Sequence, residues 1–207
     1  MKIYTKICGI TRECDAECAI NSGVDALGFI AFPKSKRYIT PTRFGELSKF
    51  IDKRVPCVCV FVDPSQKEID AYIELGADII QLHGNEKVDF IEKQTQPVWK
   101  AINLHSEKQI ADSAKLPVEK ILIDAFVKDA DVPGGMGKKA NWVLARKAVK
   151  ELTIPVILAG GLNQKNIIDA IRKVNPSGVD ISSGIEDSPG IKNHHKIQAL
   201  LKIIHSQ

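Results

Sequence analysis

Long apolar runs are absent from this sequence of 207 residues. No stretch approaches the roughly 20 consecutive apolar residues that a membrane-spanning helix needs, so we expect no membrane partner. A signal peptide is not predicted either, because Lys6 and Arg12 interrupt any apolar core near the first residue. We therefore expect a cytoplasmic protein.

Charge of one sign is not concentrated anywhere in the chain. The net charge is +4, and the lysines are spread along the sequence rather than gathered in a block. We therefore expect no nucleic-acid partner, whereas a small anionic ligand is compatible with this balance. The hydrophobic content of 44% and the charged content of 26% are typical of a globular protein with a substantial core.

Cysteines are few and lack the spacing of a metal site or a disulfide framework. The chain has five, an odd number, and no Cys-x-x-Cys motif, so neither a bound metal nor a set of disulfides is expected. Cys8 is unusual because it ends an apolar stretch and is followed at once by Gly9, so its role depends on the fold. The other four are interpreted as small buried hydrophobic residues: Cys14, Cys18, Cys57 and Cys59.

Short apolar runs alternate with helical stretches from one end of the chain to the other. The runs are rich in Val and Ile and nearly continuous in hydrophobicity, which is typical of strands buried on both faces. The predicted strands are Lys2–Cys8, Ala26–Phe32, Cys57–Val62, Asp78–His83, Val98–Asn103, Lys120–Asp124, Val156–Gly160 and Val179–Ser183.

Helix-start signals lie between these runs. Thr40 precedes a proline and predicts a cap followed by a first-turn proline. Ser65 and Ser106 each begin a capping-box pattern, with Glu or Gln three residues later. Asn85 and Asn163 are also predicted to cap helices.

A Gly-Val/Ala-Asp tripeptide recurs between a helix and the next strand. It occurs at Gly23, Gly76 and Gly178, about 50 and 100 residues apart, close to two and four copies of one strand–helix unit. Eight such units in this length predict an α/β fold, a single (β/α)8 TIM barrel domain spanning residues 1–207. A doubly wound open sheet is the alternative, but it needs fewer strands and does not account for the recurrence.

A barrel of this kind places its chemistry at the C-terminal ends of the strands. Cys8 ends the first predicted strand and therefore lies on this rim. Gly160-Gly161 and Ser183-Gly184 end the seventh and eighth strands, where backbone N–H groups can receive a phosphate, so we expect a phosphorylated small-molecule ligand. Other polar residues at strand ends are Arg37, Asp63, His83 and Asp124.

Each of these side chains has a functional and a structural interpretation. Arg37 offers a planar fork that suits a carboxylate, although a basic loop is often only solvated. Asp124 ends an apolar run and can hold a proton for general-acid work, or it can cap a helix or form an ion pair. His83 is either a binding group or a satisfied histidine on the rim. His194 and His195 are interpreted as a solvated helix face.

The sequence also resembles a known family. The segments KICGIT, GFIAF, SKRYI, QLHG, ILIDAF, PGGMG, LAGGLNQKN and GVDISSGIEDSPGIK, in this order, resemble phosphoribosylanthranilate isomerase of tryptophan biosynthesis over essentially the whole chain. The resemblance implies an Amadori rearrangement of N-(5-phosphoribosyl)anthranilate to 1-(2-carboxyphenylamino)-1-deoxyribulose 5-phosphate. It implies no metal and no cofactor.

The resemblance also implies roles for individual residues. Asp124 would be the general acid that protonates the ribose ring oxygen and opens the ring to a Schiff base. Cys8 would be the general base that removes the proton from C2, working as a thiolate favoured by a cationic rim. Arg37 would hold the anthranilate carboxylate. The remaining substrate-binding residues would be Gly160, Gly161, Ser183 and Gly184 at the phosphate, supported by His83 and Asp180.

Some positions depart from the family pattern. The longest loop, Val127–Lys139, is predicted to be a lid, and Met136 stands where the family often has Thr. Ala140-Asn141 replaces Phe-Asp, and Asn193 replaces an Asp near the last helix, where Asn caps as well.

Two other functions are compatible with these residues. One is a different sugar-phosphate barrel enzyme, such as an aldolase that forms a Schiff base on Lys100. The other is a barrel that binds a phosphorylated ligand without turnover. The expected oligomeric state is a monomer or a homodimer.

Overall fold

The computed structural model describes residues 2–124 and 142–206. The predicted lid Val127–Lys139, with Met136, lies outside the described residues, as do Ala140 and Asn141.

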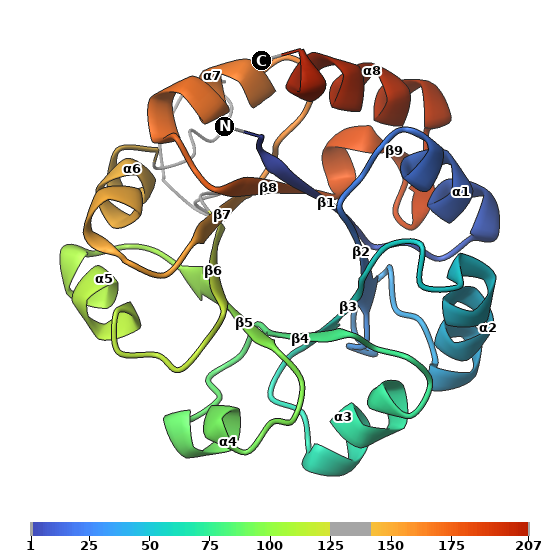
Figure 1. The fold of residues 1–207 in the computed structure, drawn as a ribbon, viewed down its shortest axis with the longest axis horizontal. Coiled ribbons are helices and arrows are strands. Elements are labelled where there is room, and N and C mark those ends of the chain that lie inside the picture. The colour runs from blue at the N-terminus through green and yellow to red at the C-terminus, as the bar shows by residue number, and fades with distance from the viewer. Residues whose placement is uncertain (1, 125–141, 207) are drawn as a thin grey trace.

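Within the described residues, eight parallel strands form a closed barrel in chain order (Figure 1). The first strand pairs with both the second and the eighth, which closes the sheet, so the open-sheet alternative is wrong and the TIM barrel is confirmed. Each predicted strand lies within two residues of an observed one. The strands are β1 (Tyr4–Cys8), β2 (Ala26–Ile30), β3 (Cys57–Phe61), β4 (Ile79–Leu82), β5 (Val98–Asn103), β6 (Lys120–Asp124), β7 (Val156–Ala159) and β8 (Gly178–Ile181).

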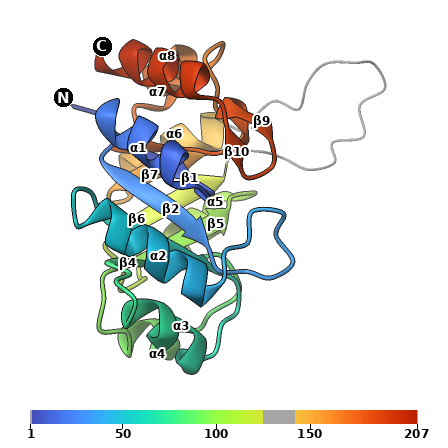
Figure 2. The same ribbon diagram turned by 90° about the vertical axis from the view of Figure 1, so that its right-hand side faces the viewer.

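Helices ring the outside of the barrel, and a short hairpin follows its last strand (Figure 1). Both termini lie on the left in Figure 2, whereas the β2 arrow and the hairpin lie toward the opposite, C-terminal face of the barrel. The helices are α1 (Glu13–Asn21), α2 (Pro41–Ile51), α3 (Gln66–Ile73), α4 (Val88–Glu92), α5 (Glu107–Ser113), α6 (Trp142–Glu151), α7 (Ile167–Val174) and α8 (His194–His205). The elements after β8 are η1 (Ser183–Ile185), β9 (Glu186–Ser188) and β10 (Ile191–Lys192).

Local capping chemistry accounts for the starts of three helices, as the sequence predicts. The side chain of Thr40 accepts an N–H from the first turn of α2, and Ser65 and Ser106 form the predicted capping boxes of α3 and α5. The predicted caps Asn85 and Asn163 are wrong, because α4 and α7 begin three and four residues after them. The side chain of Asn163 is instead used in a turn, where it accepts the N–H two residues later.

Successive side chains along each strand alternate between the inside of the barrel and the layer between the barrel and its helices. Outward-facing residues such as Ile7, Phe29 and Cys59 pack against the helices in one large apolar core. Cys57 is buried as predicted, but the prediction is wrong for Cys14, which is exposed on α1, and holds only in part for Cys18, which is half-buried. The fully buried apolar residues of α1 are Ala16 and Ala19, and Cys18 and Ile20 pack beside them, partly buried.

Candidate active site

A cavity of about 290 Å³ opens at the C-terminal ends of the strands. Eight of the nine predicted site residues line its wall, and the exception is Gly184. The predicted residues that line the cavity are Cys8, Arg37, His83, Asp124, Gly160, Gly161, Asp180 and Ser183.

Cys8 is the last residue of β1 and lies on the same face of that strand as Lys6. The two side chains meet above Gly28 of β2, where an added Cβ would lie 2.8 Å from Cys8 Sγ and 2.9 Å from Lys6 Cε. Burial raises the pKa of the Cys8 thiol, and the ammonium groups of Lys6 and Lys192 oppose this shift only in part. The positive charges favour the thiolate as expected, but desolvation is the larger effect, so the pKa of Cys8 lies above its ordinary value.

Lys6 and Asp180 form an ion pair inside the barrel. Lys6 is fully buried, and its Nζ lies 2.9 Å from Asp180 Oδ2. The two residues are partners in the β1–β8 register, which places them side by side across the seam that closes the barrel. Burial alone would lower the pKa of Lys6, but Asp180 and Cys8 hold it above its ordinary value. Lys6 is therefore a fixed positive charge below the thiol.

Gln81 lines the same cavity and was not predicted from the sequence. It is almost fully buried, and its Oε1, like Oδ1 of Asp180, has no hydrogen-bond partner among the described residues. The sequence does contain a signal for Gln81. Side chains alternate between the two faces of a strand, so Gln81, two residues before His83, faces the same side of β4.

Asp124 and His83 lie at the ends of strands on the other side of the cavity from Cys8. Asp124 ends β6, and His83 follows β4 with its N–H bound to the carbonyl of Phe61 at 2.8 Å. Burial lowers the pKa of His83, and the Asp124 carboxylate opposes this shift. His83 is therefore a neutral group at pH 7. Cys8 and Asp124 face one cavity from different strands and can reach different atoms of one small molecule.

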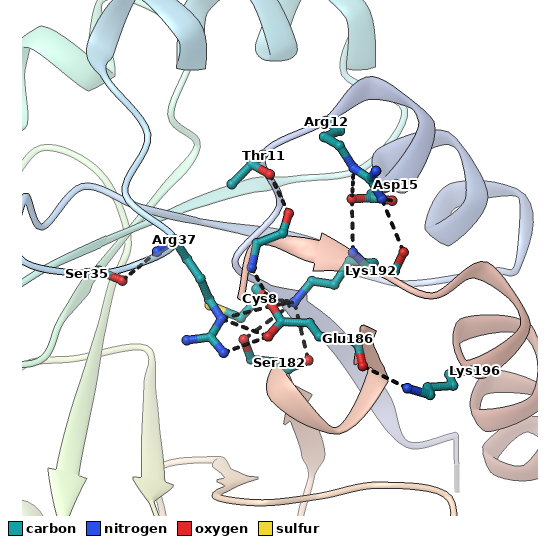
Figure 3. A network of polar contacts seen from close by, with 11 residues as sticks. Cys8, Thr11, Arg12, Asp15, Ser35, Arg37, Ser182, Glu186, Lys192 and Lys196 are labelled. Atoms are coloured by element: carbon teal, nitrogen blue, oxygen red, sulfur yellow. Dashed lines mark hydrogen bonds and ion pairs between the residues drawn. The ribbon is translucent and has the colours of Figure 1, made fainter. Parts of the chain in front are cut away.

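Arg37 does not present a free fork to the cavity. Its Nε and Nη2 donate to the carboxylate of Glu186 at 2.9 and 2.6 Å, a pairing drawn in Figure 3. The pairing joins the loop after β2 to the hairpin after β8, and nothing in the local sequence around either residue predicts it. Glu186 is thus a second site residue that sequence reasoning missed.

The loop after β7 has the backbone that an anion site needs. Gly160 and Gly161 have φ values of 94° and 64°, a region that side chains disfavour. Within the described residues, their N–H groups donate no hydrogen bond. Gly184 does not line this cavity, and an added Cβ there would lie 2.0 Å from Leu162 O. It lets the β8 loop approach the β7 loop from behind and lines a separate hollow with Lys165.

Lys100 is occupied by partners rather than exposed to the cavity. Its Nζ lies 3.1 Å from Glu86 Oε2 and donates to the carbonyls of Gly84 and Ala101 at 2.8 and 3.1 Å. An aldolase needs an amine that can reach its substrate, so this geometry disfavours the Schiff-base alternative. Asp63 also lies away from the cavity, where its carboxylate accepts the N–H of Asn85.

Within the described residues, one group lies close enough together to hold a metal: Cys14, Asp15 and His194. The Asp15 carboxylate already accepts two hydrogen bonds from Arg12, at 2.8 and 2.7 Å, so a second cation there would face the guanidinium. His194 Nε2 lies 2.9 Å from Asp15 Oδ1, so this histidine is not simply solvated as expected. No helix in the described part of the chain is long and apolar enough to cross a bilayer.

Comparison with known proteins gives a consistent result. The profile of the family described as N-(5'phosphoribosyl)anthranilate (PRA) isomerase matches residues 5–203. Proteins named N-(5'-phosphoribosyl)anthranilate isomerase from Nitrosomonas eutropha and Nitrosomonas europaea are 37% and 38% identical to this chain, covering 100% of it and 98% and 97% of their own length.

Solved structures agree with the sequence comparison. Phosphoribosyl anthranilate isomerase from Thermotoga maritima has a TM-score of 0.87 and 34% identity, covering 99% of this chain and 100% of its own. Another, in complex with reduced 1-(o-carboxyphenylamino)-1-deoxyribulose 5-phosphate, has a TM-score of 0.86 and 32% identity with the same coverage. A third structure concerns monomers made from the dimeric Thermotoga maritima protein, at 33% identity, a TM-score of 0.85 and the same coverage. The chain belongs to the phosphoribosylanthranilate isomerase family.

Proposed function

We propose that this chain catalyses the Amadori rearrangement of N-(5'-phosphoribosyl)anthranilate in tryptophan biosynthesis, within a single barrel domain. The observation that carries the proposal is one cavity with a carboxyl group and a thiol on different strands, Asp124 and Cys8. The product is 1-(2-carboxyphenylamino)-1-deoxyribulose 5-phosphate.

The first chemical step is opening of the ribose ring. Asp124 donates a proton to the ring oxygen while the anthranilate nitrogen supplies its electron pair to C1. The C1–O bond breaks, and a protonated Schiff base forms between nitrogen and C1. General acid catalysis suits this step because the leaving oxygen would otherwise depart as an alkoxide.

The second step moves a proton away from carbon. Cys8 accepts the proton from C2, and the electron pair forms the C1–C2 double bond of an enolamine as it neutralises the Schiff base. Tautomerisation to the ketone then completes the rearrangement. The fixed charge of Lys6 below the thiol supports the thiolate when it forms, and burial makes that thiolate a stronger base.

Two anionic groups of the substrate set its orientation. The phosphate binds the N–H groups of the β7 and β8 loops at Gly160, Gly161 and Ser183, with Gly184 supporting the approach of those loops. The anthranilate carboxylate binds the remaining edge of Arg37. His83 and Asp180 contact the sugar between these ends. The steps are proton transfers and the cleavage of one C–O bond within a single molecule, so the chemistry requires no redox cofactor.

The expected oligomeric state and location complete the proposal. The dimeric state described for the Thermotoga maritima relative supports a monomer or a homodimer here. A cytoplasmic location accords with a small-molecule biosynthetic reaction. Light scattering of the purified chain measures the oligomeric state. Fractionation of cells that express the chain measures its location.

The test is a fluorescence assay with substrate prepared from anthranilate and ribose 5-phosphate. With purified protein, the adduct should disappear faster than it hydrolyses without protein. The amount of product formed should equal the amount of adduct consumed. The double variant Cys8→Ser/Asp124→Asn should abolish this, whereas Cys14→Ser, which changes an exposed cysteine, should not. Binding of the reduced product analogue without any turnover would instead favour the non-catalytic barrel.

A further inference from the structure

The hairpin β9–β10 carries two buried charges that the proposed proton transfers do not use. Glu186 begins β9 and Lys192 ends β10, and their side chains are 4% and 0% exposed. Lys192 Nζ lies 2.7 Å from Glu186 Oε1. Burying two charges carries a large desolvation cost, and such a pair gives little net stability. Stability alone therefore does not account for this pair.

Lys192 ties this hairpin to the ends of two barrel strands. Its Nζ donates to the carbonyl of Cys8 at 2.6 Å and to the carbonyl of Ser182 at 3.3 Å. Figure 3 shows these contacts converging on one ammonium group beside Glu186. The position of the Glu186 carboxylate is thereby fixed relative to the strand end that carries the thiol.

Glu186 in turn occupies one edge of the Arg37 guanidinium. Oε1 accepts from Nε at 2.9 Å and Oε2 accepts from Nη2 at 2.6 Å, which is a bidentate pairing along the side of the group. The end edge, formed by Nη1 and the second N–H of Nη2, is left over. In Figure 3 the third nitrogen points away from Glu186, and within the described residues Nη1 makes no hydrogen bond.

The stem of Arg37 is held as well as its head. It passes over Gly9, where an added Cβ would lie only 2.6 Å from Arg37 Cδ. Arg37 is thereby held at two places, its stem and its guanidinium. It also loses little side-chain freedom when a ligand binds, which favours a ligand whose carboxylate meets the remaining edge in one direction.

We propose that Glu186, held in place by Lys192, is a positioning residue that makes Arg37 selective for the carboxylate of the aromatic amine. Glu186 thereby sets the preference of the enzyme for a sugar phosphate whose aromatic amine carries a carboxylate over one whose aromatic amine lacks it. This inference rests on the proposed function, because it concerns the same cavity and the same substrate.

The experiment compares two substrates in the full-length protein: the anthranilate adduct of ribose 5-phosphate and the aniline adduct, which lacks the carboxylate. Glu186→Gln keeps the shape of the side chain but removes its charge and one acceptor. The kcat/KM for the anthranilate adduct should fall about 10–100-fold, mainly through KM, in line with the loss of a charge-assisted contact. The kcat/KM for the aniline adduct should change less than about threefold, because that substrate makes no contact with Arg37.

Glu46→Gln is the matched control. It removes an exposed carboxylate that Arg43 contacts at 2.7 Å on the outer helix α2, so the substrate ratio should stay at the wild-type value. In an Arg37→Ala background, Glu186→Gln should cause no further loss of discrimination, because the two changes act through one group. If Glu186→Gln folds poorly, Glu186→Asp replaces it. Aspartate keeps the negative charge, but its shorter side chain moves the carboxylate away from Arg37, so the same selective loss of kcat/KM for the anthranilate adduct is expected.

An equal loss for both substrates would overturn the inference and leave Glu186 a structural residue. So would a wild-type protein that does not distinguish the two substrates. A wild-type protein that turns over neither substrate refutes the proposed function instead. In that case, the affinities of the reduced product analogue and its uncarboxylated counterpart test the role of Glu186 separately.

Discussion

Lys6 and Asp180 lie side by side inside the barrel below Cys8, with 2.9 Å between Nζ and Oδ2. One residue is on β1 and the other on β8, so their ion pair spans the seam at which the barrel closes. The same two side chains face the thiol. Fold closure and the protonation of Cys8 therefore depend on the same pair of charges.

Lys6→Met should destabilise the protein by about 3–5 kcal/mol, because it leaves the buried Asp180 carboxylate without its partner. Urea unfolding measures this change. The double variant Lys6→Met/Asp180→Asn removes both charges and should recover much of the loss. A double variant no more stable than Lys6→Met would show that the ion pair is not the cause.

Cys8→Ser should lower kcat by about 10²–10⁴-fold, the usual contribution of a general base, because a hydroxyl is hardly ionised at neutral pH. KM should change little, since Cys8 is assigned no part in holding the phosphate or the carboxylate. Steady-state kinetics gives both values, with exposed Cys14→Ser as the control. If Cys8→Ser turned over near the wild-type rate, Cys8 would not be the base and would serve only in packing.

Asp124→Asn should lower kcat by a similar factor, about 10²–10⁴-fold, because the amide keeps the shape but has no proton to transfer to the ring oxygen. The reduced product analogue should still bind, which isothermal titration can measure. The limb of the pH profile of kcat/KM that needs the acid form should disappear. A variant that retains this limb would assign the proton donor to another group.

The pH dependence of the base follows from the raised pKa of Cys8. A base acts only after losing its proton, so kcat/KM should rise with pH and level off above the ordinary thiol range. Lys192 lowers the pKa of Cys8, so Lys192→Met should move this limb to still higher pH. Alkylation of Cys8 against pH, in a Cys14→Ser background, gives the pKa directly. A limb below the ordinary thiol range would contradict the desolvation argument.

Inorganic phosphate should stabilise the protein through the loop after β7. Saturation at 100 times the dissociation constant adds about 2.7 kcal/mol to the free energy of unfolding, which a thermal shift detects. Gly161→Ala should weaken the effect, because an alanine disfavours the positive φ that aims the N–H groups. Gly23→Ala is the control, since Gly23 has a φ of 84° but precedes β2 at the opposite face. Equal phosphate stabilisation in both variants would place the anion elsewhere.

The pattern of residue types along the chain is enough to predict the barrel and most of its rim. Buried parallel strands need continuous apolar runs, and eight such runs separated by helix caps leave few other folds. Once the strands are known, their last residues are known to meet at one face. Cys8, His83, Asp124 and Gly160 could therefore be placed together although they are far apart in the chain.

The contacts of those groups become known only from the folded chain. Arg37 and Glu186 are 149 residues apart, and their pairing depends on how a two-stranded hairpin folds back over the barrel. Gly184 follows β8 but packs against Leu162 of the β7 loop instead of lining the cavity. The raised pKa of Cys8 follows from its burial, which outweighs the nearby basic residues. Such properties arise from distances and desolvation between distant segments, which a pattern of residue types does not encode.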